Sequence, residues 1–176
     1  CNQQKTPLVF FQDVSGFMVG SRSEHGGIIK DGAKMVNAMA NSVVPKFTFI
    51  VGNSYGAGNY GMCGWAYEPD FLFAWPNART GVMAGQSAAT TMTEVAKVGA
   101  ARKCKPIPES QLEAQGQTIK QHFDAQEDAF YTSGRVLDHG IIDPRDTRKV
   151  LAFCLETIIE GRHRSLQSNS FGVARM

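Results

Sequence analysis

The sequence lacks long apolar runs, closely spaced cysteines and any strong excess of charge of one sign. No stretch stays apolar over the roughly 20 residues that a transmembrane helix needs, so we expect no membrane association. The four cysteines form no C-x-x-C pair, so we expect neither a metal site nor a disulfide, and a reducing compartment is the default. A net charge of +2 is too small to indicate nucleic-acid binding. Function must therefore be sought in local motifs.

The order of elements predicts an α/β fold in one domain. With 176 residues, of which 43% are apolar, the chain can bury a core of its own. We expect strands at residues 7–12, 47–51, 71–75 and 80–83. We expect helices after Gly26-Gly27, after the glycine-rich turn that follows residue 51, over 85–98, over 109–131, and from Asp143-Pro144 to about residue 160. Glycines follow the carboxyl ends of the strands, where α/β folds place ligands, and the repeating strand–turn–helix units favour stacked ββα turns.

Residues 46–62 are the most informative segment, because a strand there passes through a glycine-rich turn into a helix. Backbone N–H groups at such a turn, together with the helix dipole, stabilise negative charge on a bound oxygen. Three interpretations overlap: a G-x-S-x-G nucleophile elbow around Ser54, a G-x-G-x-x-G dinucleotide motif over residues 56–61, and a main-chain oxyanion hole around Gly56, Ala57 and Gly58. The dinucleotide interpretation lacks the acidic residue about 20 positions further on that would hold a ribose.

The hydrolase interpretation stays open on sequence grounds. Ser54 would be the nucleophile, followed in the order of that fold by Asp143 or Asp146 and then His163. However, His163 lies in a polar segment that resembles an exposed helix end, and His139 precedes the acidic residues. The simpler alternative for Ser54 is a turn residue that bonds its own backbone.

Several longer segments resemble the carboxyltransferase (β) subunits of biotin-dependent acyl-CoA carboxylases, and specifically the second of their two crotonase-like domains. The segments are Gln12-Asp13-Val14-Ser15-Gly16-Phe17, Gly26-Gly27-Ile28-Ile29-Lys30-Asp31-Gly32, Tyr55-Gly56-Ala57-Gly58-Asn59-Tyr60-Gly61-Met62-Cys63-Gly64, Trp75-Pro76-Asn77-Ala78-Arg79, Gly140-Ile141-Ile142-Asp143-Pro144-Arg145, and Phe171-Gly172-Val173-Ala174-Arg175-Met176. The motifs are most similar to the methylcrotonoyl-CoA and geranyl-CoA branch. Trp65 and Gln86-Ser87 depart from that pattern, so the resemblance leaves the acyl group open.

The resemblance implies a crotonase/ClpP-like spiral of ββα units with additional C-terminal helices. It implies that residues 1–176 are the C-terminal carboxyltransferase domain of a longer β subunit whose N-terminal carboxyltransferase domain is absent from this sequence. The implied reaction moves a carboxyl group from carboxybiotin, carried on a partner subunit, to an acyl-CoA such as 3-methylcrotonoyl-CoA. A related acyl-CoA decarboxylase subunit, working in the reverse direction, is the alternative that the resemblance leaves open.

The resemblance also implies partners and a location. The partners are the acyl-CoA substrate, a biotin carboxylase/biotin carrier (α) subunit, and further β subunits, in a homo-oligomer expected to be a hexamer. No nucleic acid, membrane or metal ion is implied for this domain. The protein would be cytoplasmic in a bacterium and would lie in the mitochondrial matrix in a eukaryote.

Individual site residues follow from the same match. The amides of Ala57 and Gly58 would form the oxyanion hole for the biotin ureido oxygen, and Gly56 would permit the turn. Glycine at position 58 would be needed because a side chain there would obstruct biotin. Tyr60 would face the acyl group, with ordinary packing as its alternative. The residues expected to line the biotin pocket are Gly16, Phe17, Gly26 and Gly27.

Overall fold

The computed structural model describes residues 1–105, 107–166, 168 and 172. Its strands are β1 (Leu8–Val14), β2 (Lys46–Tyr55), β3 (Phe71–Ala74) and β4 (Arg79–Gly81). Its α-helices are α1 (Ser21–His25), α2 (Ile28–Ala40), α3 (Gly56–Gly61), α4 (Gly85–Arg102), α5 (Glu109–Asp124), α6 (Ala129–Gly134) and α7 (Thr147–His163), with 3₁₀ turns η1 (Trp65–Tyr67) and η2 (Pro144–Asp146). Of the quoted segment 171–176, every residue except Gly172 lies outside the described residues.

A parallel sheet lies at the centre, in the order β1-β2-β3, and β4 pairs with the carboxyl-terminal part of β2. Side chains alternate between the two faces of a strand. Phe47 and Phe49 of β2 therefore share one face, where they form a core with Cys154 of α7. Ile50 faces the other way and packs with Leu72 and Ala129. Helix α7 thus packs on one face of the sheet, and Ala129 of α6 contributes to the core on the other.

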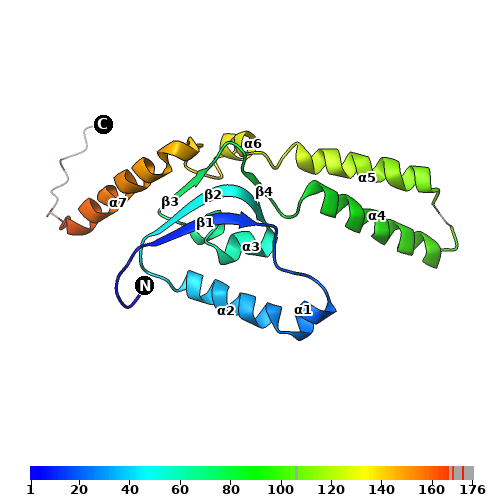
Figure 1. Cartoon of the computed structure of the whole chain (residues 1–176), viewed down its shortest axis with the longest axis horizontal. Helices are drawn as coiled ribbons and strands as arrows, with labels where there is room; N and C mark the ends of the chain where they lie inside the picture. Colours follow the sequence, from blue (N-terminus) through cyan, green and yellow to red (C-terminus); the bar gives the residue numbers. More distant parts are fainter. Residues whose placement is uncertain (106, 167, 169–171, 173–176) are drawn as a thin grey trace.

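Helices α4 and α5 form an antiparallel hairpin that projects away from the sheet (Figure 1). The single helical region expected over residues 109–131 is divided, because the Asp128 carboxylate accepts hydrogen bonds from the amides of Phe130 and Tyr131 (2.9 and 3.0 Å) and thereby caps a new helix, α6. The expected cap at Asp143 is confirmed. Its side chain accepts from the amide of Arg145 at 2.9 Å, although the first turn is 3₁₀ and α7 follows it.

Strand β2 is longer than predicted and continues through the segment expected to be a turn. Ser54 pairs with Val14 of β1 and with Thr80 of β4, so ladder bonds on both sides extend the strand to Tyr55. The Asp13 carboxylate supports this extension by accepting from the amide of Asn53 at 2.9 Å. The turn into α3 therefore begins at Gly56. Among the described helices, none has the length and apolar content needed to cross a membrane.

Candidate functional site: a main-chain turn beside a cavity

The junction between β2 and α3 presents main-chain donors. Gly56 adopts the left-handed region (φ +53°), and a Cβ at this position would lie 3.0 Å from the carbonyl oxygen of Val82. Glycine is therefore required both by the backbone conformation and by the close approach. Ala57 and Gly58 follow in the first turn of α3, where amides have no partner within the helix, and Tyr55 at the N-cap makes no side-chain capping bond.

A cavity of about 770 Å³ opens beside this turn. Gly16 and Phe17, in the loop after β1, line it together with Gly56 and Ala57. Gly16 has φ +120° and no side chain, so it leaves the floor of the cavity open. The structure thus brings together four of the residues that the sequence assigned to one pocket. The rest of the wall comes mainly from the segment 82–87 and from α5.

A second hollow, of about 680 Å³, lies on another side of the same turn. It shares Gly56, Ala57 and Val82 with the first cavity and adds Tyr60, whose side chain is half exposed and makes an edge-on contact with Tyr67 (ring centroids 5.8 Å apart). The hollow is completed by Tyr131, Arg135 and Leu137, among others. The tip of the turn therefore borders two separate spaces.

Packing gives a reason for glycine at position 58 that the sequence did not suggest. A Cβ at this position would lie 2.6 Å from Cγ2 of Val14 and 3.4 Å from Cα of Gly16. It would point into the packing between α3 and β1, and Gly58 lines neither of the two spaces described above. The close approach of helix α3 to strand β1 thus requires glycine here, and the expected obstruction of biotin stays a prediction.

Phe17, Gly26 and Gly27 occupy three different settings. Phe17 lines the cavity and also packs directly on Gly32 of α2, so it serves both the pocket and the core. Gly26 ends α1 and Gly27 begins α2 with φ +97°. Neither of these glycines is among the residues that line the cavity, so their role at the site remains a prediction.

A buried polar cluster holds α3 against the sheet. Gln12 and Ser54 are fully buried; the Ser54 hydroxyl donates to Oε1 of Gln12 and accepts from Nδ2 of Asn59 at 2.8 Å. Nε2 of Gln12 donates to the carbonyl oxygen of Met62 at 2.8 Å, just beyond the end of α3. These bonds attach the middle and the C-terminal end of the short helix to β1 and β2.

The same geometry removes the serine hydrolase alternative. Ser54 lies inside β2 with no exposed surface, and its hydroxyl is committed to the polar cluster. His163 is the exposed last residue of α7, and Nδ1 of His139 accepts from the amide of Leu72 at 3.0 Å. Ser54, His139 and His163 therefore form no triad. Burial also raises the pKa of the Cys63 thiol, so this buried sulfur is no thiolate nucleophile at neutral pH.

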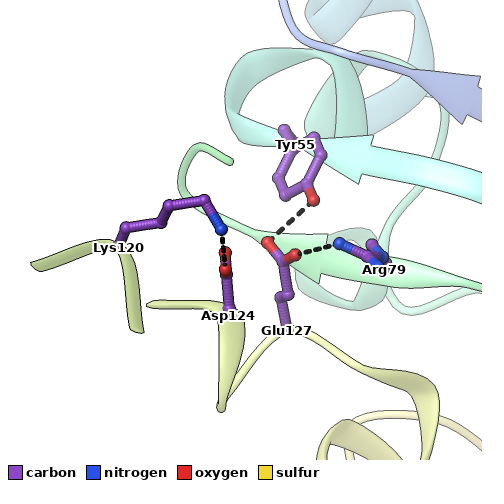
Figure 2. Close-up of polar contacts among 5 residues, drawn as sticks. All are labelled: Tyr55, Arg79, Lys120, Asp124 and Glu127. Carbon is purple, nitrogen blue, oxygen red and sulfur yellow. Dashed lines mark hydrogen bonds and ion pairs between the residues drawn. The ribbon is translucent and has the colours of Figure 1, made fainter. Parts of the chain in front are cut away.

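Charged side chains from α5, from the connection that follows it and from β4 lie on one wall of the cavity (Figure 2). Glu127 is almost fully buried and accepts hydrogen bonds from the Tyr55 hydroxyl (2.8 Å) and from Nη1 of Arg79 (2.8 Å). Lys120 and Asp124, one helical turn apart on α5, form a second ion pair. Burial and the bond to Glu127 raise the pKa of Tyr55, so its phenol stays protonated and remains a donor. No residue pattern signalled this cluster, because 72 positions separate Tyr55 from Glu127.

Among the described residues, no three His, Cys, Asp or Glu side chains come together in a way that could hold a metal ion. Two ion pairs, Arg79–Glu127 and Lys120–Asp124, lie on the wall of the first cavity.

At the end of β2 the chain turns at a left-handed glycine into a short helix, and Gly56 and Ala57 of this turn line a cavity. This arrangement is of the type expected for an oxyanion hole. Comparison with known proteins gives the family: residues 1–173 match the carboxyl transferase domain, and the chain belongs to this family. It is 47% identical over 176 residues to the mitochondrial methylcrotonoyl-CoA carboxylase beta chain of Arabidopsis thaliana, covering 100% of this chain and 30% of that protein. It is 44% identical to the biotin-dependent 3-methylcrotonyl-coenzyme A carboxylase beta1 subunit of Mycobacterium tuberculosis, covering 100% of this chain and 33% of that subunit.

Solved structures of related proteins agree with this family assignment. The beta subunit of P. aeruginosa geranyl-CoA carboxylase superimposes with a TM-score of 0.90 at 44% identity, over 100% of this chain and 33% of that one. The transcarboxylase 12S hexamer gives a TM-score of 0.72 at 30% identity, over 96% of this chain and 30% of that one. The predicted crotonase-like α/β fold and the methylcrotonoyl-CoA/geranyl-CoA branch are thereby confirmed. The chain spans about a third of the length of these relatives.

Proposed function

We propose that this chain supplies the biotin side of a carboxyltransferase active site, in an enzyme that moves a carboxyl group from carboxybiotin to an acyl-CoA. The observation that carries the proposal is the turn at Gly56, which places Ala57 on the wall of a cavity, with Gly58 next in the chain, in a member of the carboxyl transferase family. The relatives named methylcrotonoyl-CoA carboxylase favour 3-methylcrotonoyl-CoA or a similar branched, unsaturated acyl group as the acceptor.

The cavity fits the ureido ring of biotin. Its volume of about 770 Å³ falls within the usual range of small-molecule pockets, roughly 300–1,000 Å³. Gly16 and Gly56 carry no side chains, so a planar ring can approach the amide of Ala57, and Phe17 adds an apolar wall. When bound, biotin carries the transferred carboxyl group and its ureido oxygen gains negative charge during transfer. The amides of Ala57 and Gly58 stabilise that charge as preorganised donors.

The second hollow suits the acyl group. Tyr60 borders it on one side and Leu137 on another, and the tip of the turn at Ala57 separates it from the first cavity. A carboxyl group must pass between two reactants held within a few ångströms of each other. Two spaces that share one turn meet this requirement, so Tyr60 is proposed to contact the acyl chain.

The remaining parts of the enzyme are proposed from the relatives. We propose that residues 1–176 correspond to the second carboxyltransferase domain of a β subunit, and that the first domain, which binds the thioester, belongs to the rest of that subunit. A partner subunit carries biotin. The hexamer of the transcarboxylase 12S relative supports an assembly of several β subunits. The mitochondrial names of the plant and animal relatives favour the mitochondrial matrix for a eukaryotic source, and the cytoplasm is proposed for a bacterial one.

Removal of a single main-chain donor tests the proposal. Replacing Ala57 by lactic acid through nonsense suppression converts its amide to an ester and deletes the N–H without changing the side chain. In the complete subunit, assembled with its biotin-carrying partner, we expect kcat for carboxyl transfer to fall by about 10²–10³, as for one lost oxyanion donor. Carboxylation of biotin by the partner should be unchanged.

Ala66 provides the matched control. It lies in the first turn of η1, is exposed, and borders neither hollow. Lactic acid at position 66 deletes an equivalent first-turn amide and should leave kcat unchanged. Full activity of the position 57 ester, or equal losses at both positions, would refute the proposed oxyanion hole.

A further inference from the structure

Glu127 is a buried carboxylate that the proposed reaction does not use. The residue is 5% exposed and lies in the connection between α5 and α6. A buried carboxylate is costly unless charged and neutral donors satisfy it. Glu127 receives one of each, because Oε1 accepts from the Arg79 guanidinium and Oε2 accepts from the Tyr55 hydroxyl, both at 2.8 Å (Figure 2).

The two donors come from the strands that shape the turn. Tyr55 is the last residue of β2, directly precedes Gly56 and is the N-cap of α3. Arg79 begins β4, the strand that pairs with the end of β2. The main chain adds a further bond, because the carbonyl oxygen of Glu127 accepts from the amide of Thr80 at 2.8 Å. One residue therefore joins the α5–α6 connection to both strands at the point where the donor turn begins.

We propose that Glu127 is a positioning residue of the carboxyltransferase site: through Tyr55, it sets the direction of the amide of Ala57, which lines the cavity. The inference rests on the proposed function and deepens it. The ring of Tyr55 cannot swing about its Cα–Cβ bond without breaking the hydrogen bond to Glu127, and bonds from Arg79 and Thr80 of β4 hold Glu127 in place. Glu127 thus holds Tyr55, the N-cap of α3. The buried cluster around Ser54 holds the body of the same helix against the sheet.

This geometry separates positioning from general stability. Glu127, Tyr55 and Ala57 all line the same cavity. The core around Phe49 contains neither Glu127 nor Tyr55, so a shift of Tyr55 should change the geometry of the donor amide and leave that core intact. A displacement of about 1 Å at a reacting centre can lower a rate by about a hundredfold. Binding of acyl-CoA, which is proposed to use the other hollow and the first domain, should be little affected.

The central variant is Glu127→Gln in the complete subunit with its partner. The amide keeps the shape of the side chain but turns an NH₂ group toward one of the two donors, so one bond is lost. We expect kcat for carboxyl transfer to fall by about tenfold to a hundredfold, with KM for acyl-CoA unchanged. Tyr55→Phe, which removes only the hydroxyl and leaves the Arg79–Glu127 pair, should lower kcat in the same direction by less, and it serves as the second variant if Glu127→Gln fails to fold.

A matched control variant and a rescue variant show whether the effect is specific to Glu127. Glu160→Gln makes the same chemical change in a carboxylate that also pairs with an arginine, Arg164, on the exposed side of α7, and it should leave kcat unchanged. Arg79→Met should lower kcat as Glu127→Gln does, whereas Arg79→Lys, which keeps a cationic donor, should restore part of it.

A combined variant decides whether Glu127 acts through the amides. If it positions the amide of Ala57, then Glu127→Gln should cost less than about twofold in kcat once position 57 is an ester, because coupled residues are not additive. Two results would overturn the positioning role and leave the oxyanion hole intact. One is a loss of kcat in the combined variant equal to the product of the two separate losses, and the other is an unchanged kcat in both Glu127→Gln and Tyr55→Phe. If the ester at position 57 has no effect by itself, both the proposed function and this inference fall together.

Discussion

Replacement of Gly58 by alanine tests the contact that brings α3 closest to the sheet. The added Cβ would lie 2.6 Å from Cγ2 and 3.0 Å from Cγ1 of Val14. Carbon atoms in contact prefer about 3.5–4.0 Å, so α3 or β1 must move by about 1 Å to accept the methyl group. Overpacking of this kind costs about 1–3 kcal/mol, and because both contacts involve a strand that is paired along β2, we expect about 2 kcal/mol.

Urea unfolding of Gly58→Ala alone and in a Val14→Ala background measures the effect. Val14→Ala removes both methyl groups that clash, and the next atom, Cα of Gly16, lies at a tolerable 3.4 Å. The cost of Gly58→Ala should therefore fall to about 0.5 kcal/mol or less in that background, a coupling within the usual range for contacting residues. An unchanged free energy of unfolding in Gly58→Ala, or the same cost in both backgrounds, would refute the packing argument.

Carboxyl transfer by the same variants separates packing from obstruction. If a side chain at position 58 displaces α3, the amide of Ala57 moves with it and kcat falls, and Val14→Ala should restore much of the loss. If the side chain instead projected toward biotin, removal of the Val14 methyl groups would restore nothing. Rescue by Val14→Ala is thus the result that the structure predicts.

Three further predictions concern the same end of β2. Ser54→Ala removes the buried hydroxyl that binds the side chains of Gln12 and Asn59, and it should lower the free energy of unfolding by about 1–3 kcal/mol in urea titrations. In the wild type, a fluorophosphonate probe should fail to label Ser54, and labelling would contradict its burial. Gly56→Ala forces a side chain into the left-handed region and against the Val82 carbonyl, so we expect a loss of at least about 1–2 kcal/mol, and an unchanged urea midpoint would contradict this. The raised pKa of Tyr55 means that its stabilisation is complete below about pH 10 and declines as pH rises above that value; urea midpoints should therefore fall more steeply there for wild type than for Tyr55→Phe.

Much of the fold could be predicted from local patterns. The apolar, β-branched and aromatic run at the start of β2 and the Asp143 cap are local signals, and both are confirmed. The length of β2 could not be predicted, because the bonds that extend it to Tyr55 come from β1, some 40 residues earlier, and from β4, which follows it. The break between α5 and α6 depended on Asp128, whose capping role is visible in the sequence only once the helix end is known.

Part of the site could likewise be predicted from short motifs, and part depends on residues that are distant in the sequence. Gly56 and Ala57 belong to one short motif, and the loop carrying Gly16 follows the neighbouring strand, so their meeting at one cavity follows from a parallel sheet. The reason for Gly58 required knowledge of which strand lies beneath α3. Glu127 could not be found, because a carboxylate in a polar, mostly exposed helical region looks like a solvated side chain until the fold brings it to Tyr55.

The position of one turn decides between the two chemistries that share the G-x-S-x-G pattern. A nucleophile elbow requires serine at the bend itself, where its hydroxyl is exposed. Here paired strands on both sides carry Ser54 into the sheet, two residues before the bend, and its hydroxyl binds Gln12 and Asn59 instead of a substrate. The bend falls on Gly56, which offers no side chain, and the amide of Ala57 follows it in the first turn of α3. The five residues of the pattern therefore supply a structural hydroxyl and the bend, and the proposed main-chain donor is the next residue. Under this proposal the chemistry depends on backbone geometry, which Glu127 is proposed to control from a distance.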